Sequence, residues 1–203
     1  AISSFLLFGL DSQYNNQAIL GIALTAAQQD DYIGAINASR VLKEKNQDDL
    51  AIDESYLLMP YFYEKSQQLV AASFGYSEAI SYYQNKIYSL EKLTSSSINL
   101  QNTPINIEHA ATMRINNSRI DFSSAYPKSF FINREKMVAY KQWLTRLNNP
   151  ELEQKFTVMT SAYDDLAVEM ANSILQNKLD NLNSYLNQSR YGLARLFDNN
   201  MVE

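Results

Sequence analysis

The sequence contains no cysteine and a single histidine, His109. The lack of cysteine excludes disulfide bonds, thiolate zinc sites, iron–sulfur clusters and cysteine nucleophiles. A metal site built on two histidines cannot form within one chain that has only one. The sequence therefore predicts no metal site.

Glycine and proline are also scarce. The chain has five glycines and four prolines, where average usage predicts roughly 24 together. The glycines are never closer than 12 residues apart, whereas a phosphate-binding loop needs them a few residues apart. This scarcity excludes nucleotide-binding loops and disfavours turn-rich β folds, so it predicts an all-α protein without a cofactor.

The charge balance is acidic, with 17 basic and 22 acidic residues and a net charge of −5. A general nucleic-acid binder needs a basic surface, so we expect no nucleic-acid partner. The apolar opening Ile2–Leu10 is shorter than the roughly 20 residues of a membrane-spanning helix. We expect membrane association only through a segment preceding residue 1, if at all.

Two helical hairpins are predicted in the first half of the chain. From Asp11 to Gln47, apolar residues follow helical spacing on both sides of a polar break at Gln28–Asp31. Two amphipathic helices joined by a short polar turn form an antiparallel hairpin.

The second hairpin is predicted over residues 53–93. Asp53 is the expected N-cap of a helix over Tyr56–Phe74, Gly75 the expected turn, and Tyr76–Leu93 the partner helix. Pro60 falls inside the first of these helices, where proline either kinks a helix or ends it.

One short motif occurs in both predicted hairpins: Tyr32-x-x-Ala35-Ile36 is repeated 44 residues later as Tyr76-x-x-Ala79-Ile80. This pattern resembles the tetratricopeptide repeat (TPR), with Ala23 as the small residue where two helices cross. The 44-residue period departs from the usual 34 of that family, and Gln67 stands where the second copy should have a small residue.

The phrases Glu54–Tyr61 and Tyr185–Leu196 resemble a group of proteobacterial cell-envelope proteins with such repeats. That likeness implies no activity. It does imply a location in the periplasm or cell envelope of a Gram-negative bacterium, with the cytoplasm as the alternative.

The rest of the chain predicts two further regions after the TPR-like region 1–93. Residues 94–130 show no lasting period and are predicted to form an irregular connector with one helical turn near Glu108–Arg114. Residues 131–203 are predicted to form long helices that pack on the first region or extend it. One helix is expected over Arg134–Leu147 and another from Asn149-Pro150, a helix-start signal.

Two heptad-like leucine runs follow after residue 150, with a slip between Met170 and Leu175. This slip indicates either one long helix whose buried face rotates or two helices that meet near Asn172-Ser173.

The resemblance to TPR proteins implies that a peptide or protein partner binds the inner face of the repeat helices. By that alignment the face is lined by Gln17, Leu20, Leu24, Tyr61, Glu64 and Gln68. The alternative is that Leu20 and Leu24 belong to the core, beneath the C-terminal helices.

No residues converge in the way that catalysis requires. The acidic pairs Asp30-Asp31, Asp48-Asp49 and Asp164-Asp165 are adjacent in sequence, and adjacent helical side chains do not face each other. We therefore expect no enzyme but a protein-interaction scaffold or adaptor. The alternative is a structural coiled coil that self-associates into a homo-oligomer through 151–198, and a lesser one is a carboxylate-dependent hydrolase.

Overall fold

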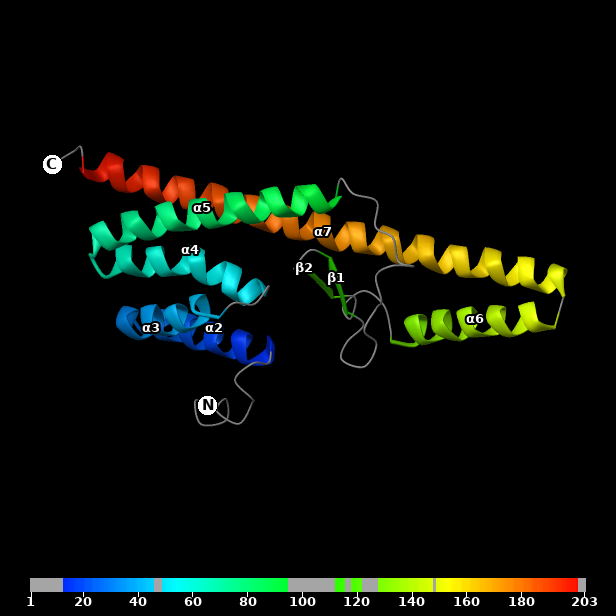
Figure 1. Ribbon diagram of the computed structural model, residues 1–203. Helices are drawn as coiled ribbons and strands as arrows, with labels where there is room; N and C mark the ends of the chain where they lie inside the picture. Colours follow the sequence, from blue (N-terminus) through cyan, green and yellow to red (C-terminus); the bar gives the residue numbers. More distant parts are fainter. Residues whose placement is uncertain are drawn as a thin grey trace. The chain divides into compact units, whose positions relative to one another are not determined.

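The computed structural model describes residues 13–45, 49–94, 112–115, 118–121, 128–147 and 149–200. Apart from one pair of short strands, every regular element in these ranges is a helix (Figure 1). The predicted all-α class is therefore confirmed at this level. The chain divides into two compact units, residues 1–88 with 180–203 and residues 89–179.

The first helical hairpin forms in the first unit as predicted. Helices α2 (Gln13–Gln28) and α3 (Tyr32–Lys43) flank a turn in which Asp30 has a positive φ of 59°. Asp31 caps α3, because its carboxylate accepts a hydrogen bond of 2.9 Å from the Gly34 backbone N–H. The polar break in the sequence is therefore this turn.

The second hairpin forms with different boundaries. Helix α4 covers Leu50–Lys65 and helix α5 covers Leu69–Thr94. The predicted turn at Gly75 is wrong, since the chain turns around Gln67, which has a φ of 62°. The predicted cap is also wrong, because the Asp49 carboxylate accepts the Ala51 N–H at 2.9 Å, and α4 continues through Pro60.

Gly75 is needed for close packing of two helices rather than for a turn. A Cβ atom at this position would lie 2.9 Å from Cβ of Pro60 on α4. This distance is well inside normal van der Waals contact. A glycine in a predicted helix can therefore mark a close helix crossing, and the sequence pattern does not distinguish the two uses.

Two clusters of buried residues in the first unit combine small and aromatic side chains. One cluster joins Ala23 of α2, Ala35 and Ile36 of α3 and Phe62 of α4. A second joins Ala72 and Tyr76 of α5 to Leu196 of helix α7 (Pro150–Asn200). The C-terminal part of α7 therefore packs on the N-terminal helices.

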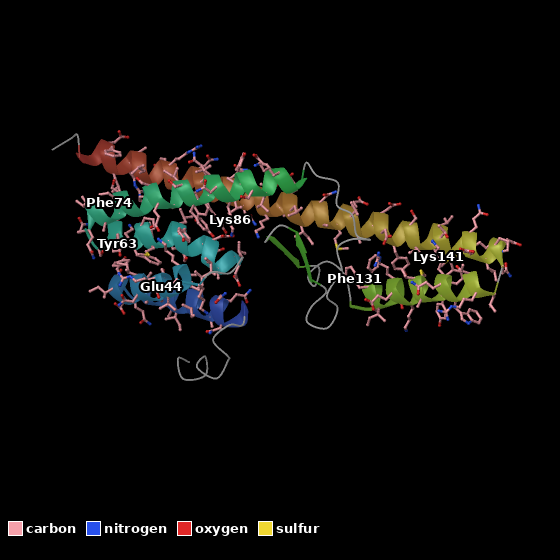
Figure 2. All side chains as sticks on the ribbon, viewed as in Figure 1. Glu44, Tyr63, Phe74, Lys86, Phe131 and Lys141 are labelled. Atoms are coloured by element: carbon pink, nitrogen blue, oxygen red, sulfur yellow. The ribbon has the colours of Figure 1, made fainter. Side chains whose placement is uncertain are left out.

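A buried polar network also ties α4 to α5. The carboxylate of Asp53 is buried and pairs with Lys86, and it accepts a 2.6 Å hydrogen bond from the Tyr82 hydroxyl. The Tyr83 hydroxyl donates to the Asp53 carbonyl at 2.6 Å. Lys86 can be followed in Figure 2. Asp53 thus stabilises the helix pair from inside the helix that it was predicted to cap.

The second unit contains strands β1 (Thr112–Ile115) and β2 (Ser118–Asp121), helix α6 (Lys128–Arg146) and the N-terminal part of α7. The strands pair antiparallel, with Thr112 opposite Asp121. The helical turn predicted at Glu108–Arg114 is wrong for its last three residues, which lie in β1. Its first four lie outside the described residues.

Helices α6 and α7 pack through aromatic rings and one ion pair. The rings of Phe130 and Tyr163 lie 4.8 Å apart, and the Arg134 Nε donates to Asp164 at 2.5 Å. Helix α6 begins earlier than the predicted Arg134. Helix α7 begins at Pro150, as predicted, and its 51 residues form one helix, so of the two predicted alternatives the single long helix is the one found.

Candidate functional site

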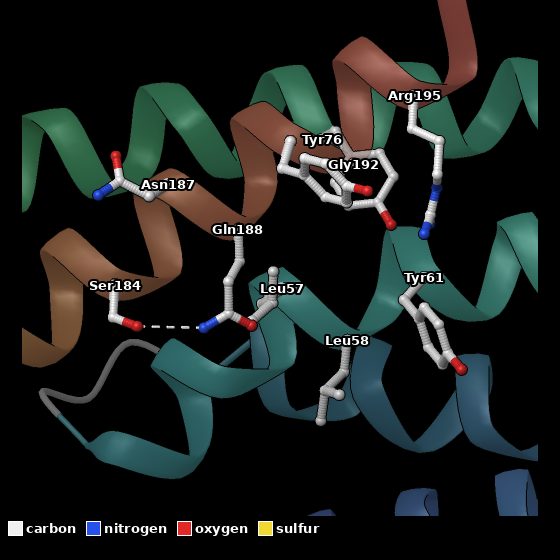
Figure 3. A pocket seen from close by; sticks show the side chains of 10 residues that line it. Leu57, Leu58, Tyr61, Tyr76, Ser184, Asn187, Gln188, Gly192 and Arg195 are labelled. Carbon is white, nitrogen blue, oxygen red and sulfur yellow. Dashed lines mark hydrogen bonds between the residues drawn. The ribbon is translucent and has the colours of Figure 1, made fainter. Parts of the chain in front are cut away.

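A pocket of about 590 Å³ opens in the first unit between α4, α5 and the C-terminal part of α7 (Figure 3). Ligand sites are commonly concave and mostly apolar, with a few polar groups that fix orientation. The lining follows this rule: Leu57, Leu58, Tyr61, Tyr76, Ser184, Asn187, Gln188, Tyr191, Gly192 and Arg195.

Helical periodicity places the lining residues on one face of each helix. On α4 they lie one turn apart, at Leu57 and Tyr61. On α7 they repeat every three to four residues, from Ser184 through Gln188 to Arg195. The pocket is therefore lined by two amphipathic faces, with Tyr76 contributed by α5.

The carboxylate of Glu64 on α4 holds one end of this site together. Nη2 of Arg195 lies 2.7 Å from Oε1 and 2.6 Å from Oε2 of this carboxylate. The Tyr76 hydroxyl donates to Oε2 at 3.1 Å. These contacts leave the carboxylate neutralised by one cation.

The protonation states follow from these contacts. Burial raises the pKa of the Tyr76 phenol, and the negative charge of Glu64 raises it further. The hydrogen bond to Glu64 raises the pKa of Arg195. Tyr76 is therefore a neutral donor and Arg195 a permanent cation at physiological pH.

One donor at this site has no acceptor among the described residues. The Nε–H of Arg195 is buried and makes no hydrogen bond there. Buried N–H groups are nearly always paired, so this donor is an exception, and it has almost no exposed surface that a ligand in the pocket could contact.

Gly192 lets α7 approach the Tyr76 ring. A Cβ atom at Gly192 would lie 2.5 Å from Cζ and 2.6 Å from Cε1 of Tyr76. The ring is almost completely buried and is anchored at Glu64. Any side chain at position 192 would therefore displace the ring that forms part of the pocket wall.

The six predicted site residues have different environments. Tyr61 is partly exposed and lines the pocket, while Glu64 braces its wall through Arg195. Gln68 lies in the turn after α4, where its side-chain amide donates to Ser66 Oγ at 3.0 Å.

The other three predicted residues lie on α2. Gln17 and Leu24 are exposed and Leu20 is half-buried. The described contacts do not place any of them in the pocket.

The residues contributed by α7 were missed by the sequence prediction. The repeat alignment stopped at residue 93 and so excluded them. The available signal was the phrase Tyr185–Leu196, in which polar and aromatic residues recur at helical spacing between buried leucines.

Among the described residues, no group of three or more histidine, aspartate or glutamate side chains could hold a metal ion. Within the same ranges, no helix has the length and hydropathy needed to cross a membrane.

Comparison with known proteins gives no relative: no family model, curated protein or solved structure matches the chain. The resemblance to TPR proteins therefore stays a prediction.

Proposed function

We propose that the protein is a non-catalytic adaptor that binds a peptide or protein partner at the pocket of the first unit. One observation carries this proposal: the pocket is largely apolar and lined by tyrosines, and the carboxylate beside it, Glu64, is neutralised by Arg195. The wall contains side chains suited to contact, and the adjacent carboxylate of Glu64 is already bound by Arg195 and Tyr76.

The exposure of the tyrosines supports partner binding. Tyr191 is 69% exposed and Tyr61 38% exposed, and both belong to the pocket. Tyrosine is enriched at interfaces because one ring contributes a large apolar area together with a polar hydroxyl. The cell envelope remains the proposed location, on the resemblance alone.

The test compares capture of a partner by the parent protein and by a Tyr61→Ala/Tyr191→Ala variant. Val41→Ser is the matched control, because Val41 is exposed on α3 and is not among the lining residues. Each protein is immobilised after circular dichroism shows equal helicity. Captured proteins are then purified and their Kd for each variant is measured.

The proposal predicts a purified partner that binds the parent and the Val41 variant equally and the double variant at least about tenfold more weakly. Equal binding by all three proteins would remove the pocket from any role in partner recognition.

Self-association through α7 is a second candidate, and one observation favours it. Leu152, Met159 and Leu166 lie seven residues apart on α7 and are 40–44% exposed. Apolar residues repeated every seven positions are the seam of coiled coils. By contrast, the leucines from Leu175 to Leu186 are buried within the chain and are not available to a second copy.

Sedimentation equilibrium tests this candidate with Met159→Asp and, as control, Val158→Asp, an exposed neighbour off the stripe. Self-association through the stripe predicts a dimer that only the Met159 variant dissociates. A parent protein that is monomeric at all concentrations would exclude it.

A further inference from the structure

We infer that helix α6 of the second unit binds the surface of a bilayer that contains anionic lipid. This inference concerns a different part of the chain from the pocket and is independent of the proposed function. It also departs from the sequence prediction, which expected membrane association only through a segment preceding residue 1.

Helix α6 and the residue after it carry an exposed stripe of one cation and three large apolar side chains. These residues repeat every three to four positions, so they share one face of the helix: Lys136, Tyr140, Trp143 and Leu147. Tyr140 and Trp143 are each 55% exposed, and Leu147 is 54% exposed. At 1.5 Å per residue, this α6 stripe is about 16 Å long.

The packing of α6 against α7 involves other sides of α6. Phe131 and Leu144 are buried, and their positions in the helical period differ from those of the stripe. Only the Tyr140 ring touches the edge of the interface, with its centroid 6.3 Å from that of Phe156 on α7. These contacts fix how α6 is turned about its axis, and they leave the α6 stripe open to solvent.

The stripe lies among cations that have no acidic partner. From Arg134 to its end, α6 contains four basic residues and one acidic residue, Glu135. Arg134 pairs with Asp164 of α7. Lys136 and Arg146 are exposed and form no ion pair within the ranges that the structure describes.

The acidic residues at the facing start of α7 are already engaged. Glu151 pairs with Lys155, and Glu153 accepts a hydrogen bond of 3.1 Å from the Thr145 hydroxyl. The chain as a whole has a net charge of −5, but at physiological ionic strength exposed charges are largely screened beyond about 8 Å. Local cations therefore decide what this face attracts.

This combination of side chains favours a lipid surface. Tryptophan and tyrosine are enriched at membrane–water interfaces, where the ring lies among the headgroups and its polar atom stays hydrated. Helices that lie on membranes combine such rings and leucine with lysine and arginine. Each cation near an anionic bilayer strengthens binding about fivefold.

Another exposed apolar pair in the chain lacks these features. Val70 and Phe74 on α5 are both exposed, but the cation beside Phe74, Lys43, pairs with Glu78. The chain's single tryptophan is Trp143. Aromatic rings and unpaired cations thus occur together on α6 and not on this part of α5.

The experiment mixes the full chain with vesicles of phosphatidylcholine and phosphatidylglycerol in equal parts, and separately with vesicles of phosphatidylcholine alone. Because Trp143 is the single tryptophan, its fluorescence reports directly on the stripe. The inference predicts a blue shift with the anionic vesicles alone and quenching by brominated lipid. High salt should reverse both, because it screens the charges.

Lys136→Gln and Arg146→Gln keep this reporter and should each weaken binding to anionic vesicles about fivefold. Arg190→Gln is the charge-matched control, because Arg190 is exposed on α7 in the first unit, and it should leave the affinity unchanged. Trp143→Ala, measured by vesicle co-sedimentation, should lose most of the binding. Phe74→Ala, which removes an exposed ring from α5, should retain it. Circular dichroism checks that all variants are equally helical.

Binding to neither vesicle, or equal binding to both, would overturn the inference. Anionic binding that survives the changes at Trp143, Lys136 and Arg146 would also overturn it. A blue shift with polyglutamate but not with vesicles would assign the stripe to an acidic protein instead. A blue shift that grows with protein concentration in the absence of vesicles, with no further change when they are added, would assign it to a second copy of the chain.

Discussion

Replacing Gly192 by alanine sets two opposite effects against each other. Gly192 lies inside α7, where alanine is favoured over glycine by about 1 kcal/mol of helix propensity. The added Cβ, however, would lie 2.5, 2.6 and 2.9 Å from three atoms of Tyr76. These distances are far below the usual 3.5–4.0 Å separation of carbon atoms.

The packing effect should win. Overpacking a well-packed core costs about 1–3 kcal/mol, and three overlaps with an anchored, buried ring place Gly192→Ala near the upper end of that range. After subtraction of the propensity gain, the variant should lose about 2 kcal/mol of unfolding free energy. For a chain of this length that corresponds to a Tm lower by about 4–8 °C.

Gly21→Ala is the matched control. Gly21 lies in α2, and a Cβ atom there would meet nothing within 4 Å, so propensity alone should stabilise the variant by up to about 1 kcal/mol. Urea unfolding followed by circular dichroism measures both variants. In a Tyr76→Leu background the cost of Gly192→Ala should shrink. A Gly192 variant as stable as the Gly21 variant would refute the reasoning.

Three further outcomes are expected. Burial raises the pKa of four tyrosines above the usual 10.0, namely Tyr76, Tyr82, Tyr83 and Tyr185. The unfolded state therefore loses these protons at lower pH than the folded state does, and the free energy of unfolding should fall as the pH rises above 10. Urea unfolding midpoints measured against pH test this. A flat profile to about pH 11.5 would contradict this. Asp31→Ala should cost about 1 kcal/mol by removing the cap of α3, whereas Asp31→Asn should recover most of it in the same assay. Phe62→Ala should cost about 3–5 kcal/mol because Phe62 is buried in the first core cluster, and a loss below 1 kcal/mol would show that the cluster is not packed as described.

The sequence by itself determined the helical class and the local start signals. The scarcity of glycine and proline predicted helices, and the polar break at Gln28–Asp31 predicted the first turn. Asn149-Pro150 predicted the start of α7, where the Asn149 side chain accepts the Leu152 N–H at 3.2 Å. These features are local, because a cap or a helical period depends only on residues within one or two turns.

Sequence reasoning failed where a residue's role depends on a distant contact. Gly75 is a residue type typical of turns, but it lies inside α5 against Pro60. Asp53 is a residue type typical of N-caps, but its carboxylate pairs with Lys86 inside the core. In the turn between α4 and α5, Gln67 has a positive φ, a conformation that usually predicts glycine. Local pattern cannot separate these uses, because a close helix crossing involves residues far apart in sequence.

Only the tertiary structure decided where the candidate site lies. The repeat alignment predicted Tyr61 as a site residue. Another wall of the pocket comes from α7, where Arg195 contacts Glu64, a residue 131 positions earlier in the sequence. The leucine period predicts that this part of α7 is buried on one side, but not which helices cover it. Packing and charge decide which helices cover it, because Gly192 leaves room for the Tyr76 ring and the Glu64 carboxylate pairs with Arg195.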